Sequence, residues 1–172
     1  GKDVVPPVTT AALSGGARYT DQAGNVFVSG SAKVALTASD SGAGVARTEY
    51  RLDASNGPFE IYISSVQLAE GWHTIQFRSV DKAGNIEAPK SLFMMKDALA
   101  PRVELNFDKD FVRLPSGIIH ISSTSAEVEI SALDQPSSGS GLKYVRFELD
   151  GAEVQGQSAP LDMGRHSVVV RA

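Results

Sequence analysis

The side chains that could do chemistry in this chain are a few histidines and a set of aspartates. The 172 residues contain three His and no Cys, which excludes thiolate metal sites, disulfides and Cys nucleophiles. His73 and His166 each stand two residues after a Gly, on the apolar side of an alternating stretch. A ring in such a position can pack inward while its polar tip bonds the backbone upstream. A catalytic base would need a paired nucleophile or acid, so we expect His73 and His166 to be structural corner residues, and we expect no catalytic residues. His120 is unpaired and is expected on an exposed strand face.

Acidic and amide side chains near predicted turns form the second candidate set. Asp40 precedes Ser-Gly-Ala-Gly, and Asp81 begins the turn sequence Asp-Lys-Ala-Gly-Asn. One interpretation is turn formation through side-chain-to-backbone hydrogen bonds. The other is a Ca²⁺ site that stiffens a joint between modules, because carboxylate, amide and carbonyl oxygens are the ligands of that cation. Both stay open, and no other cofactor is indicated. The candidate ligands are Asp3, Asp40, Asp81, Asn85, Asp97 and Asp134.

Aromatic side chains provide a third candidate site. Trp72 is the only Trp, and Arg165 occupies the matching place in the second half of the chain. A position that holds Trp in one copy and Arg in the other is expected to face solvent or a neighbouring module. With Tyr62 or Phe59 beside it, an exposed Trp72 could stack on a sugar ring. The alternative is that Trp72 shields the corner around His73.

An internal repeat carries most of these residues twice. Four blocks recur after 93 to 97 positions, and length changes fall only in Gly/Ser/Pro segments between them. The two copies predict two domains, residues 1–96 and 97–172. The paired blocks are 2–7 with 96–101, 34–40 with 128–134, 45–53 with 142–150, and 71–79 with 164–172.

The alternation of apolar and polar residues within the blocks predicts half-buried strands. Thr48, Tyr50 and Leu52 alternate with charged residues, and the second copy repeats the pattern. No segment has a helical period, so we expect an all-β chain of two tandem immunoglobulin-like β-sandwiches with about seven strands each. The first copy continues past Arg78 into a turn and a strand over 86–95 that the second copy lacks. This difference reflects either an excerpted chain or strand exchange with a partner.

Five separated motifs occur in the order that is typical of one protein family. They are Asp3 to Pro7, 36–45 (LTASDSGAGV), 49–53 (EYRLD), 71–75 (GWHTI) and 78–87 (RSVDKAGNIE). With them the chain resembles the bacterial Ig-like repeats of large surface and secreted proteins, also called outer-membrane "β-barrel" repeat domains. The resemblance implies a spacer or adhesion module in a long exported multidomain chain, not an enzyme.

Composition narrows the partners and the setting. The net charge is −4, and no long basic run is present, which argues against nucleic acid as the main partner. The longest apolar stretches are only a few residues, so we expect no membrane insertion. The chain starts at Gly1 without a leader, so we expect a mature segment or an excerpt. The predicted function is a non-catalytic spacer that presents a binding region at the cell surface, outside the cell or in the periplasm. Its expected partners are neighbouring Ig-like modules and a host or cell-surface protein or glycan, and the alternative is a carbohydrate-binding accessory domain of a secreted enzyme.

Overall fold

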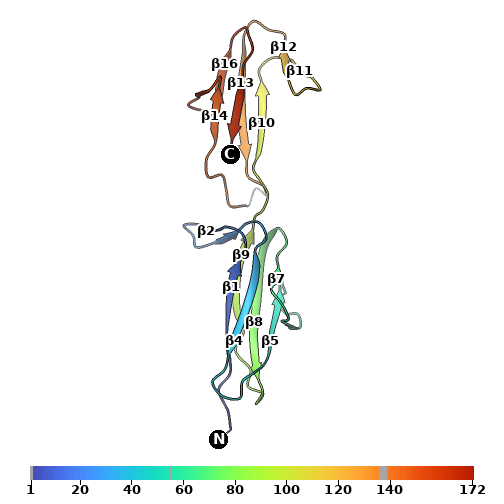
Figure 1. Ribbon diagram of the computed structural model, residues 1–172, viewed down its shortest axis with the longest axis vertical. Coiled ribbons are helices and arrows are strands. Elements are labelled where there is room, and N and C mark those ends of the chain that lie inside the picture. The colour runs from blue at the N-terminus through green and yellow to red at the C-terminus, as the bar shows by residue number, and fades with distance from the viewer. Residues whose placement is uncertain (1, 55, 136–138) are drawn as a thin grey trace. The chain divides into compact units, whose positions relative to one another are not determined.

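The computed structural model describes residues 2–54, 56–135 and 139–172. All regular secondary structure in these residues is β (Figure 1). The chain divides into two compact units, Gly1–Ala98 and Leu99–Ala172. This division lies two residues beyond the boundary expected after residue 96. The reason is that Asp97 N donates to Val28 O (2.9 Å) and Ala98 N donates to Glu70 Oε2 (3.0 Å), which ties both residues to the first unit.

The first unit contains one three-stranded and one six-stranded sheet. In the three-stranded sheet the order is β1 (Val8–Ser14), β4 (Lys33–Ser39), β7 (Val66–Gln67). In the six-stranded sheet the order is β2 (Arg18–Thr20), β3 (Val26–Val28), β9 (Lys90–Lys96), β8 (Gly71–Asp81), β5 (Val45–Leu52), β6 (Glu60–Ile61). The pair β3–β9 is parallel and the other pairs are antiparallel.

The core of the first unit lies between its two sheets. Val34 and Leu36 of β4 pack in one cluster with Ile75 and Phe77 of β8 and Met94 of β9. These side chains occupy alternate positions of their strands, because successive residues of a strand point to opposite faces. Burial of one face of each sheet is the packing of a β-sandwich.

The second unit repeats most of this plan with separate, smaller sheets. The three-stranded sheet has the order β10 (Arg102–Phe107), β13 (Ala126–Leu133), β16 (Ser158–Leu161). A hairpin joins β11 (Phe111–Arg113) to β12 (Ile119–Ile121), and a third sheet has the order β15 (Ala152–Glu153), β14 (Arg146–Leu149), β17 (Val168–Arg171). Its core contains Val128, Ile130, Phe147, Ala159 and Leu161.

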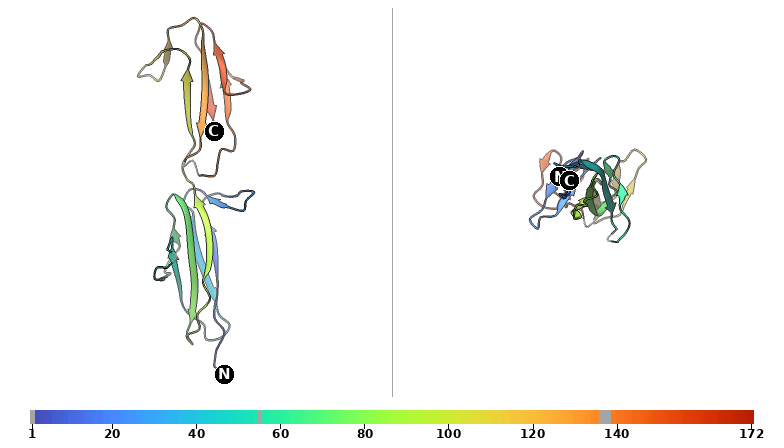
Figure 2. Two further views of the ribbon diagram at one scale, coloured as in Figure 1. Left: turned by 180° about the vertical axis from the view of Figure 1, so that it is seen from behind. Right: turned by 90° about the horizontal axis from the view of Figure 1, so that it is seen from below.

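The strand orders of the two units correspond element by element. The sheet β10-β13-β16 matches β1-β4-β7, the hairpin β11–β12 matches β2–β3, and β15-β14-β17 matches β6-β5-β8. In both units the longer strands run side by side (Figure 2). The prediction of an all-β chain is confirmed, and the described residues contain no counterpart of β9 in the second unit. None of the described residues belongs to a helix long and apolar enough to cross a membrane.

Candidate functional sites

His73 is held in a clasp of hydrogen bonds at the start of β8. Its side chain is 8% exposed, and Nδ1 lies 2.7 Å from Asp53 Oδ2 while Nε2 lies 2.9 Å from Ala69 O. Asp53 Oδ1 also accepts a bond of 2.8 Å from Thr74 N. The expected contact of the ring tip with upstream backbone is therefore present. The sequence analysis did not identify the carboxylate partner Asp53, which directly follows the neighbouring strand β5.

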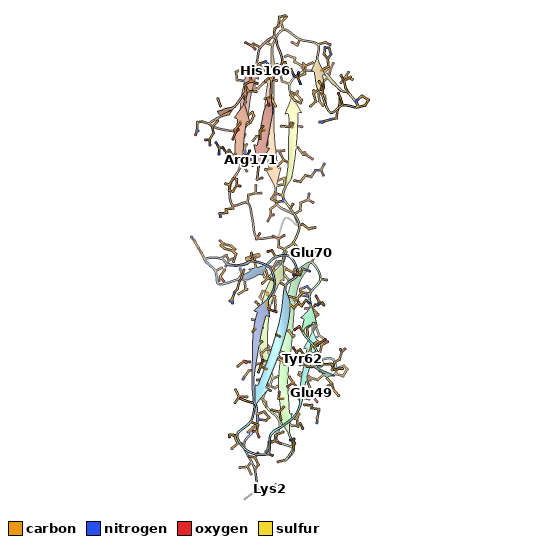
Figure 3. All side chains as sticks on the ribbon, viewed as in Figure 1. Lys2, Glu49, Tyr62, Glu70, His166 and Arg171 are labelled. Atoms are coloured by element: carbon orange, nitrogen blue, oxygen red, sulfur yellow. The ribbon has the colours of Figure 1, made fainter. Side chains whose placement is uncertain are left out.

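The second unit builds the same clasp at His166, the labelled residue at one end of its strands (Figure 3). Nδ1 lies 2.7 Å from Asp150 Oδ2, and Nε2 lies 3.1 Å from Asp162 O. Asp150 Oδ1 accepts from Ser167 N at 2.7 Å. Asp53 and Asp150 both have positive φ, 54° and 52°, a conformation that Asp tolerates better than most residues. The aspartate that recurs at matching positions of the two copies is the sequence signal that could have indicated the clasp.

The clasp geometry commits both ring nitrogens to acceptor oxygens. A neutral imidazole carries one N–H, and in the second unit the raised pKa of His166 favours the doubly protonated ring, which can donate to a carboxylate and a carbonyl together. In the second unit the hydrogen bond to Asp150 raises the pKa of His166, with a further contribution from Asp162. The same bond, donated by His166, lowers the pKa of Asp150. In both units each ring nitrogen faces an oxygen atom of the protein, so neither nitrogen is directed at a substrate, which supports a structural role. His120 lies exposed on β12, as expected.

Three aspartates meet at one end of the first unit. Asp3, Asp40 and Asp81 each place a carboxylate oxygen within 4.8 Å of the others. Asn85 joins them, because its Nδ2 donates to Asp81 Oδ2 (2.6 Å) and to the backbone oxygen of Asp3 (3.2 Å). Four of the six predicted calcium ligands are thus brought together by the segment that precedes β1, the β4–β5 loop and the β8–β9 loop. Figure 3 shows Lys2 at the same end.

Each of the three carboxylates also caps backbone N–H groups of the loops. Asp40 Oδ2 accepts from Gly42 N (3.1 Å) and Gly44 N (2.7 Å), and Asp3 Oδ2 accepts from Ala43 N (2.6 Å). Burial raises the pKa of Asp81, but hydrogen bonds from its loop outweigh this effect and leave the pKa lowered. A Cβ on Gly42 would lie 2.1 Å from Asp3 Oδ2, so only Gly permits this approach. The bonds of Asp40 and Asp81 within their own loops are the ones that turn formation predicts, whereas the bond of Asp3 to Ala43 joins distant segments. Ca²⁺ binding stays a prediction.

The other two predicted ligands, Asp97 and Asp134, are not part of this cluster. Asp97 is 7% exposed and belongs to the first unit, because its backbone N–H is bonded to Val28 O of β3. Asp134 belongs to the second unit, where its Oδ2 accepts from Gly141 N at 2.5 Å. That bond repeats Asp40–Gly44 of the first unit, so the turn role of Asp134 has direct support. The participation of Asp97 and Asp134 in a calcium site at the joint between modules stays a prediction.

The surroundings of Trp72 differ from those expected. Trp72 is 38% exposed, and its ring stacks on Phe93 with centroids 4.8 Å apart and planes 5° apart. Phe27 meets it edge-on at 5.5 Å, and Tyr19 packs on Phe27 at 5.9 Å. We call these four rings the aromatic cluster. Phe93 and Tyr19 are both more than half exposed.

Tyr62 and Phe59 are not in the aromatic cluster, so their predicted pairing with Trp72 is wrong. Tyr62 packs edge-on against Tyr50 at 6.3 Å, and its Oη accepts from Leu36 N at 3.1 Å (Figure 3). Phe59 lies beneath the guanidinium groups of Arg51 and Arg78. Register explains the difference. Trp72 pairs with Met95 of β9, whereas β5 pairs with β8 only from Ile75 onward.

A buried polar network around Glu87 was not foreseen from the sequence. Glu87 Oε1 accepts from Thr9 N (2.9 Å) and pairs with Lys90 Nζ (2.7 Å), while Oε2 accepts from Ser79 N (3.1 Å). Burial raises the pKa of Glu87, but bonds from Lys90 and Thr9 outweigh it and the pKa is lowered. The network joins β1 to β8 and β9 across 78 positions of sequence, and it is satisfied in a way that suits a structural role.

Comparison of the chain with protein-family models, with curated proteins and with solved structures finds no match in any of the three. The residues and geometry of the two units are therefore the basis for assigning a role.

Proposed function

We propose that this chain is a pair of tandem Ig-like modules that serve as a non-catalytic structural spacer in an exported, multidomain bacterial protein. The Asp–His clasp, built once in each unit, is the observation that carries this proposal. A catalytic histidine has no reason to be duplicated with the same backbone contacts, whereas a structural element is copied with the module that it stabilises.

The location of the clasp fits a spacer. Asp53 stands where β5 ends, and His73 lies on β8, so their contact joins the chain segments at one end of the sheet. The same holds for Asp150 and His166 between β14 and β17. A polar bond of this kind resists fraying of a strand end, which is where local opening begins. A module whose strand end is held closed in this way transmits extension to its neighbours.

The proposed partners follow from this role. They are neighbouring Ig-like modules of the parent chain and, at the region that the spacer presents, a host or cell-surface protein or glycan. The surface charge of the chain, −4 overall, gives nucleic acid little attraction. The proposed location is the cell surface or the extracellular space, with the periplasm as the other exported compartment.

Force spectroscopy of the chain between two reference domains tests the spacer role. We expect two separate unfolding events, one for each unit, and the fully unfolded segments should have contour lengths of about 330 Å and about 250 Å from the extended length per residue. His73→Ala should lower the force of the longer event only, and His166→Ala that of the shorter. Extension at forces indistinguishable from those of an unfolded chain would refute the spacer role.

Carbohydrate binding is a second candidate, and the aromatic cluster favours it. Trp72 and Phe93 are partly exposed rings stacked on each other, and Tyr19 extends the apolar area on β2. Aromatic faces of this kind offer large contact area at low conformational cost. The site would bind a sugar ring by stacking, with the neighbouring strands as a rigid base.

Affinity electrophoresis in gels that contain soluble polysaccharides tests this candidate. We expect retarded migration of the parent chain in at least one glycan and loss of the retardation in Trp72→Ala. Tyr144→Ala is the matched control, because Tyr144 is a 55% exposed aromatic residue of the second unit. Equal migration of all three proteins across a panel of plant, bacterial and host glycans would refute carbohydrate binding, and the spacer role would be the remaining candidate.

A further inference from the structure

An open groove for one β-strand lies between β12 and β17 in the second unit. In the first unit β9 fills the corresponding place, pairing with β3 on one side and β8 on the other. The counterparts β12 and β17 pair only with β11 and β14, and within the described residues no strand lies between them. The six-stranded sheet of the first unit thus appears in the second as two sheets, divided where β9 would run.

The correspondence holds residue by residue. Adding 93 to the bounds of β2 and β3 yields β11 and β12, and adding 93 to Ile75 of β8 yields Val168 of β17. The register of β9 in the first unit pairs Ile75 with Leu92 and His73 with Met94. An added strand in the second unit would therefore meet Val168 and His166 in the same order.

Side chains along the groove are half-buried where their counterparts in the first unit are buried. Ile75 and Phe77 are 0% and 4% exposed, but Val168 and Val170 are only half-buried. Val28 is buried beside β9, whereas the matching Ile121 is half-buried. These differences are those expected when apolar residues of two strands lack the strand that covers them.

A cavity of about 700 Å³ occupies this place. Apolar side chains from both strands line it, including Ile119 and Ile121 of β12 and Val168 of β17. The buried Leu161 and the half-buried His166 also line it, together with charged side chains such as Arg113 and Asp162. A cavity with apolar side chains between two unpaired strand edges offers both the hydrogen bonds and the side-chain pockets that an extended peptide needs.

We infer that this groove binds one further β-strand, parallel to β12 and antiparallel to β17, supplied by polypeptide outside these 172 residues. The first unit indicates the chemistry of that strand. In β9 the side chains of Leu92 and Met94 point to the core, Ser91 and Phe93 point out, and Lys90 opens the strand. The occupant is an extended segment with large apolar residues at alternate positions. This inference does not depend on the spacer role.

A synthetic peptide with the sequence of residues 86–97 provides the test. Isothermal titration into the full chain is expected to show binding of one peptide per chain. Hydrogen exchange should slow roughly tenfold or more at amides of β12 and β17, and exchange in β3 and β8 should stay unchanged. Failure to bind, or exchange protection confined to the first unit, would overturn the inference.

Peptide variants make the test independent of whether a mutant protein folds. A peptide with Leu92→Asp and Met94→Asp should not bind, because both charges would enter the apolar cavity. A peptide with Ser91→Asp and Phe93→Asp has the same added charge on the outward side and should bind. Equal behaviour of the two variants would contradict the predicted register.

Two further measurements identify the source of the strand. Appending residues 80–97 after Ala172 should raise the melting temperature of the second unit, because the appended strand can reach the groove from the same chain. An unchanged melting temperature would contradict the inference. Sedimentation of the chain without peptide should show a monomer. A dimer that protects β17 from exchange would assign the groove to a second copy and refute the inference.

Discussion

Replacing His73 with Ala tests the clasp most directly. The substitution removes a bond to Ala69 O and a charge-assisted bond to Asp53 from a side chain that is 8% exposed. A neutral bond contributes about 1 kcal/mol and a charge-assisted bond about 1.5–3 kcal/mol. Because Asp53 is 46% exposed, its bond belongs at the low end of that range. We therefore expect a loss of about 2–3 kcal/mol, which lowers the melting temperature by about 10–20 °C in a domain of this size.

Trp72 allows this loss to be measured in the first unit alone. It is the only Trp of the chain and lies one residue before His73, so thermal melts followed by Trp fluorescence report the first unit. Asp53→Asn is the matched control, since Asn also tolerates positive φ and keeps the bond from Thr74 N. We expect Asp53→Asn to be milder than His73→Ala. A His73→Ala chain that melts within about 1 °C of the parent, against the shift expected for lost buried bonds, would refute the structural role.

Three other outcomes follow from the charged groups. The pKa of His166 is raised in the folded chain, so the stabilisation of the fold by this residue is full below the ordinary pKa of 6.5 and is lost as pH rises through the folded pKa. The pKa of Asp150 is lowered, so the stabilisation of the fold by this carboxylate is present above 3.8 and is lost as pH falls through the folded pKa. Calorimetry should therefore show the second unit less stable at pH 8 than at pH 5.5, with the difference reduced in His166→Ala. Glu87→Gln should cost about 1–3 kcal/mol in urea melts because buried donors lose their acceptor, whereas Glu104→Gln, on an exposed pair, should stay within about 0.5 kcal/mol. If Ca²⁺ binds at the aspartate cluster, millimolar calcium should raise the melting temperature of the first unit and Asp81→Asn should abolish the rise; identical melts in calcium and chelator would leave turn formation alone.

Some of the candidate site was accessible from the sequence because its parts are repeated or close in the chain. His73 and His166 were recognised as corners from their place after Gly, and their upstream carbonyl partners lie only four residues away. The turn aspartates were recognised for the same reason, since Asp40 bonds N–H groups two and four residues on. Asp53 was missed although it is repeated as Asp150, because a strand end gives no local sign of what it faces.

Other contacts depend on register between distant strands. Trp72 stacks on Phe93 because β8 and β9 pair with Trp72 beside Met95 and Thr74 beside Phe93. Glu49 lies on the charged face of β5, yet it is buried because Arg47 and Arg78 flank its carboxylate at 2.5 and 2.9 Å. Neither arrangement follows from alternation along one strand, since alternation shows which face a residue is on but not what covers it.

The sequence by itself determined that the chain is all-β, that it is a duplicated module, and which residues turn inward along several of the repeated strands. These features are local or repeated, and a period of two or an offset of 93 to 97 positions can be read without knowing which strands pair. The tertiary structure alone decided which side chains meet, including the carboxylate that clasps each His, the rings beside Trp72 and the network around Glu87. It also decided that β12 and β17 flank an open groove. The physical reason is that hydrogen bonds between strands and the packing of two sheets join residues 78 and 81 positions apart, and the free energy of those contacts is set by the whole fold.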